Sequence, residues 1–109
     1  MTNSFKIIQP EGILDGTGAN NLRREILDEI DRGVKIILVD LKNVTFMNSS
    51  GMGALVATLK TVKMAGGRLP LCSLSDQVKI IFELSRMERI FQIYRDRQEF
   101  EAKLAAEVK

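Results

Sequence analysis

The spacing of apolar and polar residues along the chain predicts an α/β protein. Short apolar runs of strand length occur at residues 5–8, 12–14, 34–41, 68–73 and 90–94. Amphipathic helices, in which apolar residues recur every three or four positions, are predicted over residues 19–32, 49–64, 77–87 and 96–106. Since strands and helices alternate through short loops, we expect right-handed crossovers and a mostly parallel sheet of about four or five strands, with about four helices.

The predicted strands differ in the positions that we expect for them in the sheet. Residues 34–41 are apolar almost throughout, which is typical of a strand that is buried on both faces. Residues 5–8 and 12–14 are separated by a Pro-Glu turn, so we expect them to pair antiparallel, which would make the sheet mixed. Pro70 lacks a backbone N–H and therefore disfavours a central position for the strand at residues 68–73.

Length and composition indicate one globular domain. A chain of 109 residues is long enough for a single hydrophobic core, and 45% hydrophobic with 28% charged residues is ordinary for such a domain. The N-terminus lacks the apolar segment of a signal peptide, and the longest apolar run, residues 36–39, is far shorter than the roughly 20 residues that span a membrane. We therefore expect a cytoplasmic protein that binds no membrane.

The absence of histidine and the presence of a single cysteine, Cys72, argue against several function classes. Most zinc and non-haem iron sites need these residues, and serine hydrolases of the triad type need a histidine base. We therefore expect no metal and no cofactor, and we expect Cys72 to be a buried, inert thiol. The net charge is +2 and no basic stripe is interleaved with aromatic residues, which argues against direct nucleic-acid binding.

The segment at residues 48–53, Asn-Ser-Ser-Gly-Met-Gly, places two glycines, which disfavour helix, in the first turn of a predicted helix. Each glycine inside a helix costs about 1 kcal/mol relative to alanine, and such departures from local preference are expected at functional sites. A phosphoryl group on Ser49 would be tolerated by the positive end of the helix dipole and would repel an acidic partner surface. A helix cap formed by Asn48 or Ser49 is the simpler explanation, but it does not account for the glycines. Met52 either contacts a partner or packs under a neighbouring loop.

Other positions are weaker candidates for contacts with a partner. Asp15 follows another predicted strand, and loops that follow parallel strands gather along one edge of a sheet, so we expect Asp15 to lie near residues 48–53. Its simpler role is to form a turn. Ile80, Leu84 and Met87 extend the apolar character of their helix beyond one stripe, which predicts either a second contact surface or a deeply packed helix.

Residues 48–53, with the strand and turn that precede them at residues 38–47, resemble the phosphorylation segment of the STAS-domain anti-sigma factor antagonists. The pattern of that family is Asp-Ser-[Ser/Thr]-Gly-apolar-Gly after an apolar strand and a short polar turn. The likeness continues at residues 12–22, 65–69 and 90–102, so it covers nearly the whole chain.

The resemblance implies a single STAS domain over residues 1–109 that works as a partner switch. The unphosphorylated form would bind an anti-sigma factor, itself a serine kinase related to histidine-kinase ATPase domains, and a PP2C-type phosphatase would reverse the phosphorylation. Ser49 carries over as the phosphoacceptor, with Ser50 as the alternative, and we expect a monomer or a weak dimer. The partner-binding residues that the resemblance implies are Asp15, Asn48, Ser50, Gly51, Met52 and Gly53. Asn48 departs from the family, which has aspartate there, and this removes a carboxylate beside the acceptor hydroxyl.

Three other functions compete with this one. An enzyme with a nucleophilic serine is disfavoured, because the chain has no histidine and no Ser-x-x-Lys arrangement near the motif. A carrier protein with a phosphopantetheine arm is disfavoured by the strand at residues 36–39 and by the net charge of +2. A STAS module that serves as a scaffold or adaptor, in an assembly that does not act on a sigma factor, stays open.

Overall fold

The computed structural model describes residues 5–107. Within that range the chain forms six strands, four α-helices and one 3₁₀ turn. In chain order these are β1 (Lys6–Ile8), β2 (Gly12–Leu14), α1 (Gly16–Asp31), β3 (Ile37–Asp40), β4 (Val44–Met47), α2 (Ser49–Met64), β5 (Leu71–Cys72), α3 (Asp76–Ser85), the 3₁₀ turn η1 (Met87–Arg89), β6 (Ile93–Tyr94) and α4 (Arg97–Glu107). The α/β class is confirmed, and α2 has the bounds that the sequence predicts.

The strands form two parallel sheets. β1, β3, β5 and β6 make a four-stranded sheet in that order, and β2 and β4 make a separate two-stranded sheet. All strand pairs in residues 5–107 are parallel, including β1 with β3 and β2 with β4. The predicted antiparallel pairing of residues 5–8 with 12–14 is therefore wrong. The Pro-Glu segment between them carries the chain from one sheet to the other instead of closing a hairpin.

The position of β5 also differs from the prediction. It lies between β3 and β6, although Pro70 argued against a central strand. Pro70 immediately precedes β5, and its carbonyl oxygen accepts a hydrogen bond from the Val39 N–H at 3.0 Å. The missing N–H of proline thus falls outside the short ladder, and its carbonyl group still takes part in the pairing.

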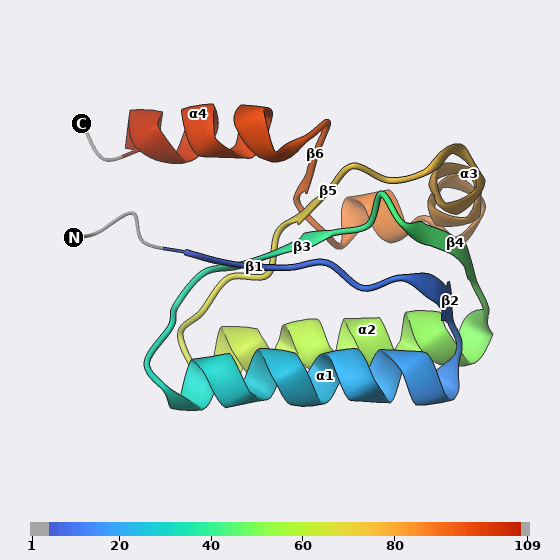
Figure 1. Cartoon of the computed structure of the whole chain (residues 1–109), viewed down its shortest axis with the longest axis horizontal. Coiled ribbons are helices and arrows are strands. Elements are labelled where there is room, and N and C mark those ends of the chain that lie inside the picture. The colour runs from blue at the N-terminus through green and yellow to red at the C-terminus, as the bar shows by residue number, and fades with distance from the viewer. Residues whose placement is uncertain (1–4, 108–109) are drawn as a thin grey trace.

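Helices cover both faces of the four-stranded sheet (Figure 1). α1 and α2 lie side by side below the sheet, and α4 lies on the opposite side. Ile37 and Val39 belong to the larger buried cluster on the α1 and α2 side, whereas Leu38 belongs to a second cluster with Phe100 of α4. The apolar run at residues 34–41 is therefore central and covered on both faces, as predicted. Among residues 5–107, none of the helices has the length and apolar character that crossing a membrane requires.

The third helix and the last strand are shorter than predicted. α3 ends at Ser85, because Arg86 adopts a left-handed conformation with φ of 62°. The turn η1 then leads to β6, which contains only the last two residues of the predicted strand at residues 90–94.

A buried polar contact fixes the start of α4. Asp40, at the end of β3, is fully buried, and its Oδ2 accepts a hydrogen bond of 2.7 Å from Nε of Arg97. A terminal nitrogen of the same guanidinium donates to Oε1 of Gln9 at 2.6 Å, and the Lys42 N–H donates to Oδ1 of Asp40 at 3.1 Å. The buried carboxylate is thus both paired and hydrogen-bonded, which is the condition under which a buried charge is tolerated.

Candidate functional site

The starts of α1 and α2 lie next to each other at one end of the molecule. β2 and β4 are parallel neighbours in which Leu14 pairs with Met47, and each strand leads directly into a helix. Figure 1 shows both helices with their N-terminal ends on the same side. A Cβ atom placed on Gly16 would lie 3.5 Å from Cβ of Ser50. The structure therefore brings Asp15 and residues 48–53 together, as the rule for parallel strands predicts.

Asn48 and Asp15 cap their helices in the same way. Oδ1 of Asn48 accepts a hydrogen bond of 2.8 Å from the Gly51 N–H, and Oδ1 of Asp15 accepts one of 2.8 Å from the Gly18 N–H. Both caps satisfy a backbone donor that the helix itself leaves unpaired. The capping explanation thus holds for Asn48, whereas Ser49 is the first residue inside α2.

Ser49 and Ser50 are exposed, and their hydroxyl groups form no hydrogen bond with any other atom of residues 5–107. The first turn of the helix needs neither hydroxyl, because Asn48 already supplies the side-chain cap. Two free hydroxyl groups therefore lie at the positive end of the α2 dipole.

The two glycines of the motif have different physical explanations. Gly51 is buried, and a Cβ atom there would overlap with the carbonyl oxygen of Leu14. It is glycine because α2 approaches β2 closely at this point. Gly53 is exposed, and a Cβ atom there would meet nothing within 4 Å. Packing explains Gly51 and leaves Gly53 unexplained.

Met52 is half-buried and packs against the larger core cluster. The alternative to a partner contact was packing under a neighbouring loop, and the contact that the buried part of Met52 makes is with the core cluster. The rest remains accessible at the start of α2, next to Gly53.

Exposed apolar side chains surround this end of the molecule. Ile13 and Phe46 are register partners in β2 and β4 and are 57% and 48% exposed. On α3, which packs beside β4, Ile80 and Leu84 are also exposed. Of the three apolar residues noted on the third predicted helix, Met87 is buried, as deep packing predicts, and Ile80 and Leu84 are exposed, as a contact surface predicts.

Sequence reasoning missed Ile13 and Phe46 as surface residues. Both lie in predicted strand or turn segments where an apolar residue is expected to point inward. Only the separation of β2 and β4 from the main sheet leaves one face of this pair accessible. The sequence carries no signal for this, because alternation along β4 from buried Val44 would place Phe46 on the inner face as well.

Charged residues are sparse around the paired helix starts. Residues 43–59 and 16–22 contain none, and Asp15 is the carboxylate that the pairing of β2 with β4 places beside the start of α2. A doubly charged group on either serine would therefore dominate the local field.

The described residues contain carboxylates, which can bind metal ions, and a single thiol. No group of three or more His, Cys, Asp or Glu side chains within residues 5–107 is arranged to hold a metal ion. Cys72 is fully buried in the cluster behind α4, and this burial raises the pKa of its thiol. The expectation that Cys72 is a buried thiol is confirmed.

Comparisons with known proteins agree with the fold. A family model described as the STAS domain matches residues 1–100. The anti-sigma-B factor antagonist of Bacillus subtilis is 33% identical over 82 residues, which are 75% of this chain and 74% of that protein.

Two solved structures show the same fold at lower identity. The anti-sigma factor antagonist SpoIIAA in its unphosphorylated form has a TM-score of 0.67 and 21% identity, covering 97% of this chain and 93% of that one. A sulfate transporter family protein from Wolinella succinogenes has a TM-score of 0.83 and 17% identity, covering 99% of this chain and 89% of that one. The family model and the Bacillus relative carry the assignment: this chain belongs to the STAS domain family.

Proposed function

We propose that this protein is an anti-sigma factor antagonist that acts as a phosphorylation-controlled partner switch and not as an enzyme. Its unphosphorylated form binds an anti-sigma factor that is also a serine kinase of the histidine-kinase-like ATPase type. Phosphorylation of Ser49 releases that partner, and a PP2C-type phosphatase restores the binding form. The observation that carries the proposal is the pair of exposed, unbonded serine hydroxyls at the start of α2, in a chain related to an anti-sigma-B factor antagonist.

Asn48 and Ser49 have different roles at the helix start, and this supports Ser49 as the acceptor. Asn48 supplies the cap, so modification of the Ser49 oxygen removes no contact that holds the helix. The phosphoryl group adds about −1.5 to −2 charges and sits where the helix dipole stabilises an anion. Phosphorylation therefore changes the charge of the surface without unfolding it.

The apolar surface around the serines supports a protein partner. Ile13, Phe46 and the accessible part of Met52 would contact the partner, and Gly53 would let the two backbones approach closely. A phosphoryl group in the middle of this surface would have to lose its hydration on binding. Since burial of an unpaired charge is strongly unfavourable, the modified form dissociates.

Asn48 preserves the geometry of the family motif and changes its charge. The amide oxygen makes the cap that a carboxylate oxygen would make. The acceptor hydroxyl therefore lacks an adjacent negative charge, which lowers the electrostatic cost of placing a phosphoryl dianion beside it. We infer that kinase recognition here depends on the hydroxyl and the apolar surface more than on an acidic neighbour.

The decisive experiment is to incubate the protein with its cognate kinase and ATP and to map the modified site by mass spectrometry. We expect one phosphoryl group, on Ser49. Ser49→Ala should abolish the modification and Ser50→Ala should leave it, because Ser50 serves as the matched hydroxyl one residue away. Phosphate on Ser50 alone would move the site by one residue, and an unmodified protein would refute the switch.

A further inference from the structure

A cavity lies between α3 and the end of the four-stranded sheet, lined by none of residues 48–53. The cavity has a volume of about 470 Å³. It is lined by Leu74, Lys79, Phe82, Glu83, Glu88, Ile93, Tyr94 and Arg95. Small-molecule sites commonly have volumes of about 300–1,000 Å³, so this cavity is large enough to hold a ligand.

The topology places this cavity where open α/β sheets bind ligands. β5 and β6 are parallel neighbours, and Leu74 and Arg95 follow their carboxyl ends. α3 follows β5, and its Phe82 belongs to the core cluster on the α1 and α2 side of the sheet. α4 follows β6, and its Phe100 belongs to the cluster on the other face. Adjacent strands whose connections leave to opposite faces create a crevice at their carboxyl ends.

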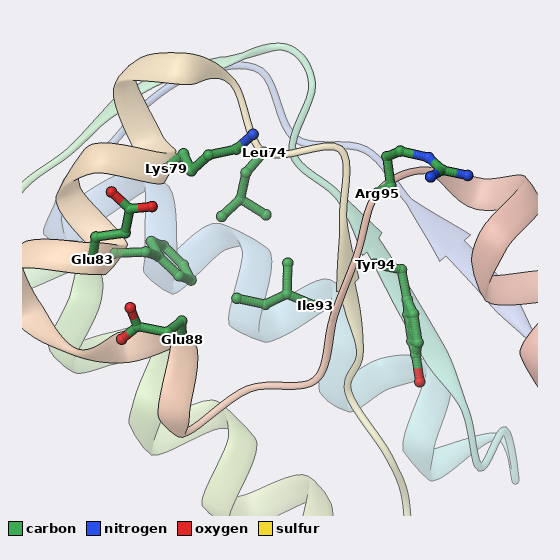
Figure 2. Close-up of a pocket in the computed structure, with 8 residues that line it drawn as sticks. Leu74, Lys79, Glu83, Glu88, Ile93, Tyr94 and Arg95 are labelled. Atoms are coloured by element: carbon green, nitrogen blue, oxygen red, sulfur yellow. The ribbon is translucent and has the colours of Figure 1, made fainter.

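The floor of the cavity is apolar. Figure 2 shows the side chains of Leu74 and Ile93 pointing into the space between α3 and β6, and Phe82 also lines it. Tyr94 and Arg95 contribute little beyond their backbone: Tyr94 packs on Phe100 with ring centroids 5.2 Å apart, and Nε of Arg95 lies 3.8 Å from Oδ2 of Asp96. The floor therefore suits branched or aromatic groups.

The rim carries charges of both signs without ion pairs. Lys79 extends over the cavity toward Leu74, and Glu83 and Glu88 lie on the side of α3 and η1 (Figure 2). All three charged residues are exposed, and none forms an ion pair within residues 5–107. The rim thus offers an ammonium group at one side and two carboxylates at the other.

The spacing of the residues that carry these charges suggests the length of the ligand. Lys79 and Glu83 are four residues apart on α3, a separation that places Cβ atoms about 5–6 Å apart. Two residues of extended chain span about 7 Å. We propose that this cavity binds a small zwitterion of dipeptide length with apolar side chains. Its ammonium group lies at Glu83 and Glu88, its carboxylate at Lys79, and its side chains on Leu74, Phe82 and Ile93.

The test is a titration of the ¹⁵N-labelled protein with the dipeptide Leu-Phe, followed by amide chemical shifts. We expect saturable changes centred on Leu74, Phe82 and Ile93. Lys79→Met and Glu83→Gln should each weaken binding by about tenfold, the loss of one charge-assisted contact. Lys60→Met, at an exposed lysine of α2, is the matched control and should bind like the parent protein.

A second ligand tests the role of the charges. N-acetyl-Leu-Phe-amide has the same apolar groups without charged ends and should bind at least tenfold more weakly. Equal binding of the two compounds would overturn the zwitterion assignment. The site would be overturned by any of three results. These are chemical-shift changes centred elsewhere, no changes up to the solubility limit of the dipeptide, or unchanged binding by both cavity variants. None of these results bears on Ser49.

Discussion

The starts of α1 and α2 have the same cap and the same close-packed glycine, so the residues in which they differ are candidates for function. Each begins with an Asp or Asn whose Oδ1 caps the N–H three residues later, at 2.8 Å in both cases. Each has glycine at that third position, because a Cβ atom on Gly18 would lie 2.8 Å from the Ile13 carbonyl oxygen and one on Gly51 would overlap with that of Leu14. The shared features are those that packing and capping require.

What α2 has and α1 lacks is the candidate site. α1 places Gly16 and Thr17 where α2 places Ser49 and Ser50, and only α2 adds Gly53, which no packing contact requires. Since the two helices share their environment, α1 serves as an internal control for mutations in α2.

The largest effect is expected where packing requires glycine. Gly51→Ala should lower the free energy of unfolding by about 3 kcal/mol, because the new methyl group would overlap with the Leu14 carbonyl and displace the helix. Gly18→Ala should lower it less, since its Cβ would be 2.8 Å from the nearest oxygen. Urea denaturation of both variants measures the difference, and equal losses would show that the two helix starts are not packed as described.

The next effect concerns binding. Ser49→Asp should weaken binding to the kinase by about tenfold or more, because it adds a negative charge to the apolar contact surface around Met52. Thr17→Asp adds the same charge to the start of α1 and should weaken binding less. Both changes place an acid in the first turn of a helix, so both have the same effect on a helix dipole. Isothermal titration calorimetry compares the affinities of the two variants for the kinase, and a larger loss for Ser49→Asp is due to contact with the partner. Equal losses of affinity would remove the functional distinction between the helices.

Loss of a cap should affect both helices alike. Asn48→Ala and Asp15→Ala should each lower the free energy of unfolding by about 1 kcal/mol, since each removes one side-chain acceptor. Asn48→Asp should retain the cap and the fold. Thermal denaturation provides the comparison, and a stability for Asn48→Asp as low as that for Asn48→Ala would refute the capping role.

The smallest effect is expected at Gly53. Gly53→Ala should raise the free energy of unfolding by up to about 1 kcal/mol, because alanine favours the helix and its methyl group meets no neighbour. The same change should weaken binding to the kinase, since it adds bulk to the contact surface. A variant that is more stable and binds equally well would leave this glycine without a functional role.

Local pattern was enough to predict the α/β class, the bounds of α2, the buried strand at residues 34–41 and the position of the serine motif. The partners of β1 and β2 could not be predicted, because two short strands separated by a Pro-Glu pair have the same local pattern in a hairpin and in two separate sheets. The reason for Gly51 lies in the Leu14 carbonyl, 37 positions earlier in the chain, and no local signal marks it. The exposure of Phe46 likewise depends on which sheet its strand joins.

The contact between Asp40 and Arg97 has a consequence for the order of folding during synthesis. The carboxylate at the end of β3 receives its shortest charged contact from a residue 57 positions later, at the start of the last helix. A ribosome-bound chain that has made β1 to β5 still carries this carboxylate without its guanidinium partner. The second face of the sheet can close only when Arg97 and the helix that it starts have been made, so the packing of this face depends on the last element of the described chain.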